Sequence, residues 1–254
     1  MGGENRRTCD YSCVAPRNCS IEIKVSMSIV DNYKKIREEI AEIAASSGRN
    51  PGVIRIIAVS KTFDETVVQR AIDAGIRVFG ENKVQEAKQK VPKLKGDFTF
   101  HMVGHLQSNK ARDAVTLFDM IHSIDKIDTA EKVDLEAGRI GKTQKVLIQV
   151  NASGEESKSG VAPESAVELV KRIREMKHLG LCGLMTMAPF TDDENVIRKT
   201  FRKTRQLLDE INNSLKTEFG ELSMGMSSDY RIAVEEGATL LRIGTAIFGH
   251  RNYE

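Results

Sequence analysis

Eight short apolar runs, separated by amphipathic segments, are the feature that most constrains the fold of this chain. The runs cover residues 53–60, 76–80, 98–104, 118–124, 145–151, 179–185, 221–225 and 239–244. The segments between them, such as DETVVQRAIDAG and PESAVELVKRIREMK, carry apolar residues at helical spacing. Strands that alternate with helices of this length indicate βαβ units and a parallel sheet. Eight such units predict one (β/α)8 barrel of the α/β class, with a doubly wound open sheet as the alternative.

A helix is predicted ahead of the first strand, beginning at Met27. Its apolar residues follow one another at steps of four and three, which places them on one helix face. They are Ile29, Tyr33, Ile36, Ile40 and Ile43. Glycine and proline in SSGRNP, residues 46–51, predict its end. We therefore expect residues 27–254 to form the barrel domain.

Residues 1–26 show little periodic patterning, and we expect a disordered N-terminal extension or the product of an upstream start. Three of the four cysteines lie in this segment: Cys9, Cys13 and Cys19. Their spacing is looser than that of paired zinc ligands and a fourth ligand is not evident, so their role stays open. Arginines in the segment leave a mitochondrial presequence open, although Glu4 and Asp10 weigh against it.

The overall charge excludes several classes of partner. The chain has 38 basic and 36 acidic residues, which leaves a net charge of +2 and argues against a nucleic-acid or membrane-surface partner. No apolar stretch approaches the roughly 20 residues that span a bilayer, and the N-terminus lacks the apolar core of a secretory signal. We therefore expect a cytoplasmic protein with a small-molecule ligand.

Polar residues follow the predicted strands at the points where each strand ends. Lys61 follows the first strand and Asn82 the second, while SMGMSSD (223–229) and RIGT (242–245) end the seventh and eighth. In a parallel barrel the active site forms at the carboxyl ends of the strands, because the following loops converge there. The sequence therefore predicts one site that combines these residues.

Lys61 is the candidate nucleophile of this site. Strand periodicity places its side chain on the face of Ile57 and Val59, so Lys61 points into the barrel mouth if that face points inward. Partial desolvation there would disfavour the ammonium form, and a neutral amine can form a Schiff base. The alternative is a structural ion pair with Glu81 or Asp125.

The last two units predict a phosphate site at the same mouth. A helix that begins near Ser227 or Ser228 would present free N–H groups, and Gly244 and Thr245 directly follow the eighth strand. Loops after the seventh and eighth strands of such barrels commonly bind phosphate. Ordinary caps and turns explain each residue separately, but not their coincidence with a lysine.

A lysine amine and a phosphate site at one mouth indicate pyridoxal 5'-phosphate, whose aldehyde would condense with Lys61. Arg242 shares a strand face with Gly244 and could reach the pyridine ring. A guanidinium beside the ring nitrogen would keep that nitrogen unprotonated, which makes the cofactor a weak electron sink. The sequence thus predicts slow carbanion chemistry.

Six motifs occur in order: AVSKT, FGENKVQEA, FHMVGHLQSNK, VNASGEESKSG, GLMTM and LSMGMSSDYRIAVEEGATLLRIGTAIFG. With this order and spacing, residues 29 to 249 resemble the pyridoxal phosphate homeostasis protein family. The resemblance implies a usually monomeric barrel like the alanine racemase N-terminal domain, with the cofactor held as an internal aldimine on Lys61. The cofactor-binding set that it implies is Lys61, Asn82, Met185, Ser223, Ser227, Arg242, Gly244 and Thr245. In this set Ser223, Gly244 and Thr245 would hold the phosphate, and Asn82 and Met185 would line the ring pocket.

The resemblance implies a protein that buffers or carries pyridoxal phosphate in vitamin B6 homeostasis, without strong turnover and with indirect effects on amino-acid metabolism. Apoenzymes that require the cofactor would be its partners. An amino-acid racemase or lyase is the alternative, but two-base racemisation needs an acid–base group opposite the lysine. No tyrosine-bearing β-domain is expected after Gly244, and Tyr33 and Tyr230 are expected in helix packing.

Two further interpretations stay open. A lysine in a barrel mouth could serve a Schiff-base aldolase that acts on sugar phosphates without a cofactor. Three histidines could bind zinc: His101, His105 and His122. We do not favour the zinc site, because Gly104 and the strand-like context deny His101 and His105 a shared helix face.

Overall fold

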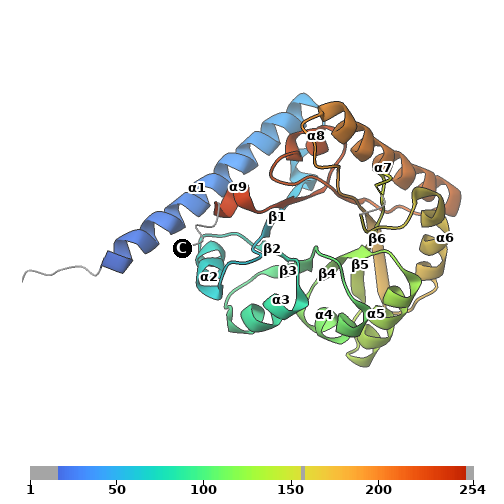
Figure 1. Cartoon of the computed structure of the whole chain (residues 1–254), viewed down its shortest axis with the longest axis horizontal. Helices are drawn as coiled ribbons and strands as arrows, with labels where there is room; N and C mark the ends of the chain where they lie inside the picture. The colour runs from blue at the N-terminus through green and yellow to red at the C-terminus, as the bar shows by residue number, and fades with distance from the viewer. Residues whose placement is uncertain (1–16, 156–157, 250–254) are drawn as a thin grey trace, which may run out of the picture.

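A closed ring of eight parallel strands forms the centre of the molecule, which was obtained as a computed structural model (Figure 1). The structure describes residues 17–249 except 156–157, and the side chains from residue 29 onward. Each strand pairs with the next one along the chain, and the last strand pairs with the first. The predicted barrel is therefore confirmed, and the open sheet is excluded because the ring closes.

The strands match the eight apolar runs of the sequence. They are β1 (Arg55–Val59), β2 (Val78–Glu81), β3 (Thr99–Met102), β4 (Met120–Ile124), β5 (Gln144–Gln149), β6 (Leu179–Met185), β7 (Glu221–Ser223) and β8 (Leu240–Ile243). Most of their residues are buried on both faces, as in β1, where only Arg55 is exposed. Continuous apolar strands suit this position, because helices cover one face and the barrel interior covers the other.

Helices surround the ring and connect successive strands (Figure 1). They are α1 (Arg17–Ser46), α2 (Glu65–Asp73), α3 (Val84–Lys90), α4 (Ala111–Leu117), α5 (Ile127–Arg139), α6 (Pro163–Arg174), α7 (Glu194–Leu215), α8 (Tyr230–Glu235) and α9 (Thr245–Phe248). Local signals set several of these ends. Asp64 caps α2 by accepting a hydrogen bond from Val67 N, and Asp193 caps α7 through Asn195 N.

Buried side chains form two shells. The outer shell lies between strands and helices and includes Phe79, Phe100 and Phe201. The inner shell contains no helix residue and lies inside the ring. Its buried apolar members are Ile57, Val59, Val103, Met120, Leu147, Met185 and Leu240. Ile57 and Val59 therefore face inward, as the expected position of Lys61 requires.

The first helix begins earlier than the sequence predicts. Helix α1 starts at Arg17 rather than near Met27, so the expected boundary between residues 26 and 27 falls inside a continuous helix. The prediction of a disordered extension or the product of an upstream start stays a prediction, while residues 17–26 form the first part of helix α1. For residues 1–16, which include Cys9 and Cys13, the prediction lies outside the described residues.

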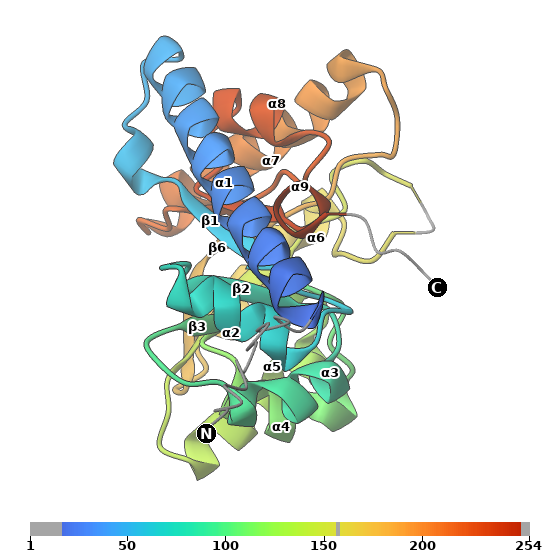
Figure 2. The ribbon, with the colours of Figure 1, turned by 90° about the vertical axis from the view of Figure 1, so that its left-hand side faces the viewer.

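Helix α1 crosses the gap between the last and first units of the barrel, next to α9 (Figure 2). Asn32 Nδ2 donates a hydrogen bond of 3.1 Å to the carbonyl of Ile247 in α9. Arg49 donates to the carbonyls of Val234 and Ala238, which precede β8. Among the described helices, none combines the length and the apolar character that crossing a membrane would need.

Candidate functional site

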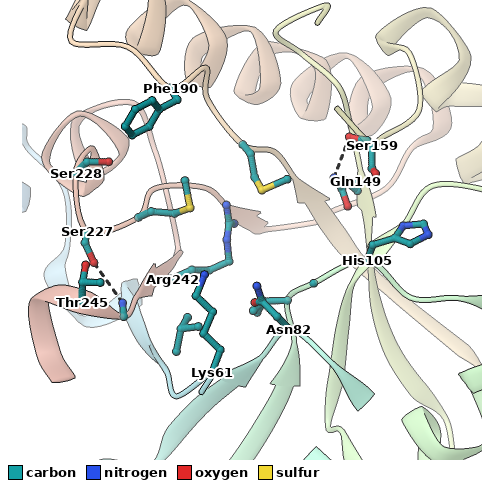
Figure 3. A pocket seen from close by; sticks show the side chains of 16 residues that line it. Lys61, Asn82, His105, Gln149, Ser159, Phe190, Ser227, Ser228, Arg242 and Thr245 are labelled. Carbon is teal, nitrogen blue, oxygen red and sulfur yellow. Dashed lines mark hydrogen bonds between the residues drawn. The ribbon is translucent and has the colours of Figure 1, made fainter. Parts of the chain in front are cut away.

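A cavity of about 560 Å³ opens at the carboxyl ends of the strands. Six of the eight residues predicted for the site line it: Lys61, Asn82, Ser227, Arg242, Gly244 and Thr245. Figure 3 shows Lys61, Asn82 and Arg242 converging on the centre, with Ser227 and Thr245 on one side and His105, Gln149 and Ser159 on the other. The cavity has the size of a small-molecule site.

Lys61 extends into this cavity from the end of β1. Its side chain is exposed, and Nζ has no hydrogen-bond or ion-pair partner within the described part of the chain. The mouth of the cavity is open to solvent around this side chain. The alternative of a structural ion pair is contradicted, since Glu81 pairs with Lys90 at 2.6 Å and Asp125 faces His105 at 4.0 Å.

The backbone around Lys61 forms a tight turn. Phe63 N donates a hydrogen bond of 3.2 Å to the carbonyl of Ser60, so Lys61 and Thr62 are the two central residues. Thr62 has φ of +70°, as the second central residue of a type II turn requires. Glycine usually fills this position, and a β-branched residue there costs about 1–2 kcal/mol. Lys61 thus belongs to a strained turn that other contacts must hold.

Arg242 forms the floor of the cavity and is held rigidly. Only 5% of the residue is exposed. Nη1 donates to Ser223 Oγ at 2.6 Å, and Nη2 donates to the carbonyl of Thr186 at 2.8 Å. Burial lowers the pKa of the guanidinium to about 10, which still leaves it charged at neutral pH. A fixed cation therefore faces any ligand of the cavity.

Two predicted site residues lie below the cavity instead of lining it. Ser223 is fully buried and its hydroxyl contacts Arg242 and His122. Met185 is 1% exposed and belongs to the inner shell. These two residues pair with each other across β6 and β7, one layer deeper than the mouth. Their expected contacts with the phosphate and the ring stay predictions, and Met187 lines the cavity two residues after Met185.

A chain of polar side chains runs through the barrel interior beneath Arg242. His122 Nδ1 lies 2.8 Å from Ser223 Oγ, and His122 Nε2 lies 3.0 Å from His101 Nδ1. Burial lowers the pKa of His101 to about 4, and burial together with His101 lowers the pKa of His122 further below its usual range. Both rings are neutral at pH 7, so each can donate one hydrogen bond and accept another. His122 therefore connects His101 to Ser223.

This arrangement argues against the proposed zinc site. His101 and His122 contact each other inside the barrel, whereas His105 is half-exposed at the mouth. Within residues 17–155 and 158–249, the structure contains no cluster of three acidic, histidine or cysteine side chains that could hold a metal ion. The histidines instead support Ser223 and, through it, Arg242.

The side of the cavity formed by the ends of β7 and β8 presents backbone N–H groups. Ser227 Oγ accepts hydrogen bonds of 3.3 Å from Gly244 N and from Ala246 N. A side chain at Gly244 would bring its Cβ within 3.3 Å of the Val59 carbonyl, so glycine keeps this wall open. An anionic oxygen at this side would compete with Ser227 Oγ for the N–H groups of Gly244 and Ala246.

Ten further residues, which the predicted cofactor-binding set does not include, line the cavity. They are Val59, Val103, Gly104, His105, Gln149, Ser159, Met187, Phe190, Met226 and Ser228. Met187 could have been found, because strand periodicity extends the face of Met185 to it. Phe190 gives no such signal, since it lies in an irregular segment and its side chain is fully exposed at the rim.

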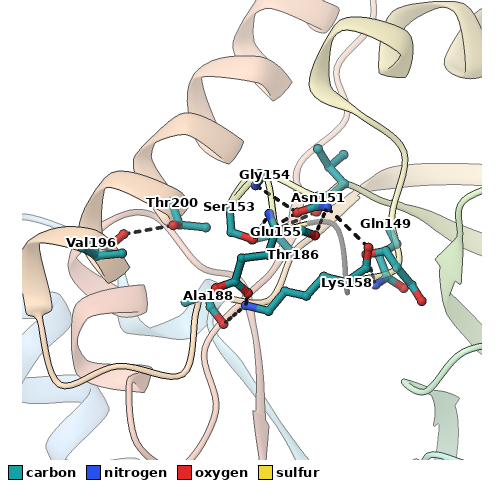
Figure 4. A network of polar contacts seen from close by, with 12 residues as sticks. Gln149, Asn151, Ser153, Gly154, Glu155, Lys158, Thr186, Ala188, Val196 and Thr200 are labelled. Atoms are coloured by element: carbon teal, nitrogen blue, oxygen red, sulfur yellow. Dashed lines mark hydrogen bonds and ion pairs between the residues drawn. The ribbon is translucent and has the colours of Figure 1, made fainter.

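The segment after β5 is tied to the segment after β6 (Figure 4). Lys158 Nζ donates to the carbonyl of Ala188 at 2.8 Å and pairs with Glu155 at 2.6 Å. Gln149 Nε2 donates to the carbonyl of Ser159 at 2.9 Å. Both segments contribute to the cavity wall, so these contacts fix its far side while the lysine side stays accessible.

The residues of the cavity fit an aromatic aldehyde that carries a phosphate. Lys61 provides an amine, and Arg242 provides a fixed cation at the floor. The side of the cavity at Ser227, Gly244 and Thr245, called the Ser227 side, provides hydroxyl and N–H groups. The three features come from different strand ends and face one cavity, as the sequence predicts. Pyridoxal 5'-phosphate has the three matching groups.

Comparisons with known proteins agree with this geometry. Residues 32–252 match the family model described as alanine racemase, N-terminal domain. The pyridoxal phosphate homeostasis protein of Aquifex aeolicus is 37% identical over 89% of this chain and 100% of its own length. That of Pseudomonas aeruginosa is 39% identical over 89% of this chain and 97% of its own length.

Solved structures are also similar. PipY of Synechococcus elongatus PCC7942, solved with pyridoxal phosphate bound, has a TM-score of 0.73 and 38% identity over 83% of this chain and 100% of its own. Alanine racemase of Clostridium difficile has a TM-score of 0.69 at 14% identity, over 88% of this chain and 58% of its own, which shows the shared fold. The chain therefore belongs to the alanine racemase N-terminal domain family, together with the pyridoxal phosphate homeostasis proteins.

Proposed function

We propose that this protein binds pyridoxal 5'-phosphate and buffers or carries it in vitamin B6 homeostasis. The observation that carries the proposal is the unpaired Lys61 amine, which opens into a cavity that Arg242 and the Ser227 side complete. The homologues named pyridoxal phosphate homeostasis protein and the PipY structure with this cofactor support it. The bound cofactor supplies an aldehyde that forms a reversible covalent bond with an amine.

Each residue of the cavity has a defined task in this proposal. The Lys61 amine would hold the cofactor through its aldehyde carbon. Arg242 would lie beside the pyridine nitrogen, where its charge would disfavour protonation of that nitrogen. Gly244, Thr245 and Ser227 would hold the phosphate and Asn82 would contact the ring, since all four residues line the cavity. Ser223 and Met185 would support this layer from below.

The residues around the Lys61 amine support the role of a carrier over that of a racemase or lyase. Among the described residues, the tyrosines lie away from the cavity: Tyr33 packs against the outer shell, and Tyr230 donates a hydrogen bond of 2.8 Å to Glu39. Arg242 also weakens the cofactor as an electron sink. We further propose a cytoplasmic monomer whose recipients are apoenzymes that require the cofactor.

Borohydride reduction followed by peptide mass mapping tests the proposal. The protein incubated with pyridoxal phosphate should gain one reduced pyridoxyl phosphate on the Lys61 peptide, and Lys61→Ala should gain none there. Lys83→Ala is the matched control, because Lys83 lines the adjoining cavity and its side chain is 72% exposed. Label on another lysine in the wild type would overturn the site assignment.

Two measurements on the same sample separate the alternatives. A visible absorbance band that is lost in Lys61→Ala identifies the cofactor and excludes an aldolase that works without one. A panel of amino acids then tests turnover. Rates well above those of free pyridoxal phosphate, abolished by Lys61→Ala, would replace the carrier with an enzyme.

A further inference from the structure

Helix α3 contacts the residues on both sides of Lys61. Lys90 Nζ donates a hydrogen bond of 2.9 Å to the carbonyl of Ser60, the residue before the lysine. Glu86 Oε2 accepts a hydrogen bond of 3.2 Å from the backbone N of Thr62, the residue after it. Glu86 and Lys90 are four residues apart and thus lie on one face of the helix. A single helix face therefore grips the strained turn at two points.

The contact with Ser60 is reinforced by a buried ion pair. Lys90 Nζ lies 2.6 Å from Glu81 Oε1, and Ser60 Oγ donates to the same oxygen at 2.7 Å. Ser60 and Glu81 are fully buried and Lys90 is 5% exposed. Burial raises the pKa of Glu81, and its Oε2 atom has no hydrogen-bond partner within the described residues. The pair is costly to bury, and a simple apolar contact could fill the same space.

The contact with Thr62 stabilises the residue whose positive φ strains the turn. A threonine at positive φ is disfavoured, and an isolated chain would leave this conformation for one with negative φ. The hydrogen bond to Glu86 holds the Thr62 N–H in the orientation that the turn requires. Glu86 also lines the adjoining cavity of about 510 Å³ together with Lys61.

We infer that Glu81, Glu86 and Lys90 form a clamp that positions Lys61 for its reaction with the aldehyde. The inference rests on the proposed function and adds residues that lie outside the cavity floor and phosphate side. In the reaction the neutral Lys61 amine would form a C=N bond with the aldehyde carbon, and the aldehyde oxygen would leave as water together with the two protons of that amine. The clamp takes no proton and donates none in this step. It restricts the directions from which the amine can approach, which raises its effective concentration at the aldehyde.

The decisive variants loosen the turn without touching the cavity floor. Glu86→Ala removes the hold on Thr62, and Lys90→Met removes the hold on Ser60. Because Lys90→Met leaves Glu81 buried without its partner, the double variant Glu81→Gln/Lys90→Met provides a second, neutral form. Lys88→Met is the matched control, since Lys88 lies on the same helix but is exposed and pairs with Asp113 at 3.1 Å.

Two quantities are measured for each variant. The first is the rate at which Lys61 is trapped by pyridoxal phosphate and borohydride, where we expect a decrease of about tenfold or more for the clamp variants and no change for Lys88→Met. The second uses the protein without cofactor: amide hydrogen exchange at Thr62 and Phe63 should become faster in Glu86→Ala. A merely general loss of stability would instead accelerate exchange throughout the barrel.

Thr62→Gly tests the role of strain directly. Glycine adopts positive φ without the penalty, so adding Thr62→Gly to Glu86→Ala should restore most of the lost trapping rate. Unchanged trapping rates in Glu86→Ala and in the double variant Glu81→Gln/Lys90→Met would overturn the clamp and leave the proposed function intact. Failure of the wild type to be labelled at Lys61 would instead overturn the proposed function.

Discussion

The two shells of the barrel differ in the side chains that form them. The outer shell, between strands and helices, consists mainly of apolar side chains such as Phe100 and Phe201, with the buried cluster of Ser60, Glu81 and Lys90 as a polar exception. The inner shell mixes seven buried apolar residues with a hydrogen-bonded chain of His101, His122, Ser223 and Arg242. Apolar packing makes the outer shell the main source of stability. In the inner shell, burial of polar groups costs free energy, and these groups hold the Arg242 guanidinium in place.

The difference between the shells predicts how substitutions in each should act. An apolar residue of the outer shell should alter the free energy of unfolding strongly and the chemistry at Lys61 little. A polar residue of the inner shell should make stability depend on pH, because burial changes its pKa. A residue at the rim should alter neither fold nor stability. Three substitutions, ordered by the size of their expected effect, can break this distinction.

Phe100→Ala should have the largest effect on stability. Phe100 is 1% exposed, stacks on Phe79 at a centroid distance of 5.4 Å and meets Phe98 edge-on at 5.7 Å. Truncation of such a ring lowers the free energy of unfolding by about 3–5 kcal/mol, because it removes apolar burial and leaves a cavity. Urea denaturation measures the loss, while borohydride trapping of the folded variant should still label Lys61. A loss below about 1 kcal/mol would contradict the assignment of stability to the outer shell.

Acid should destabilise the protein through the inner shell by an intermediate amount. The pKa of His101 is lowered by burial from 6.5 to about 4, so between these values the unfolded chain binds a proton that the folded chain does not. The stabilisation is complete above pH 6.5 and is lost as the pH falls towards 4. From pH 7.5 to pH 5, His101 alone should remove about 2 kcal/mol. Urea denaturation at both values should give a flatter profile for His101→Gln; equal profiles would mean that the ring is not held neutral.

Phe190→Ser should have the smallest effect. Phe190 is fully exposed and loses no buried contact when truncated, so the free energy of unfolding should change by no more than about 0.5 kcal/mol. The melting temperature and urea midpoint check this, with Phe100→Ala as the contrast. A substantial decrease would show that the aromatic ring packs against the rim and that the mouth contributes to stability.

The sequence predicts the eight strands, because continuous β-branched runs between amphipathic helices have few other solutions. It also predicts that Lys61, Asn82, Arg242, Gly244 and Thr245 share one cavity, since strand ends in a parallel barrel converge. These inferences depend on local periodicity and on a topological rule. Neither requires knowledge of how far each strand is shifted against its neighbours.

The depth of a residue inside the barrel is harder to predict from the sequence. Periodicity tells which face Ser223 and Met185 occupy, but their depth depends on the register between β6 and β7, which pairs them one layer below the mouth. The contact between His101 and His122 likewise arises from strands β3 and β4, whose register places His101 opposite Met120. Depth and register result from closure of the whole ring, so a local pattern does not contain them.

The hydrogen bond between Asn32 and Ile247 joins residues that are 215 positions apart in the chain. Helix α9, which holds Ile247, begins at the phosphate side of the cavity, and β8 must pair with β1 before that helix can dock. Contacts of such large sequence separation form late and slowly during folding. During synthesis, most of the helices and strands can therefore assemble while the cavity is still incomplete, and the cofactor can bind only after the final unit has joined the first.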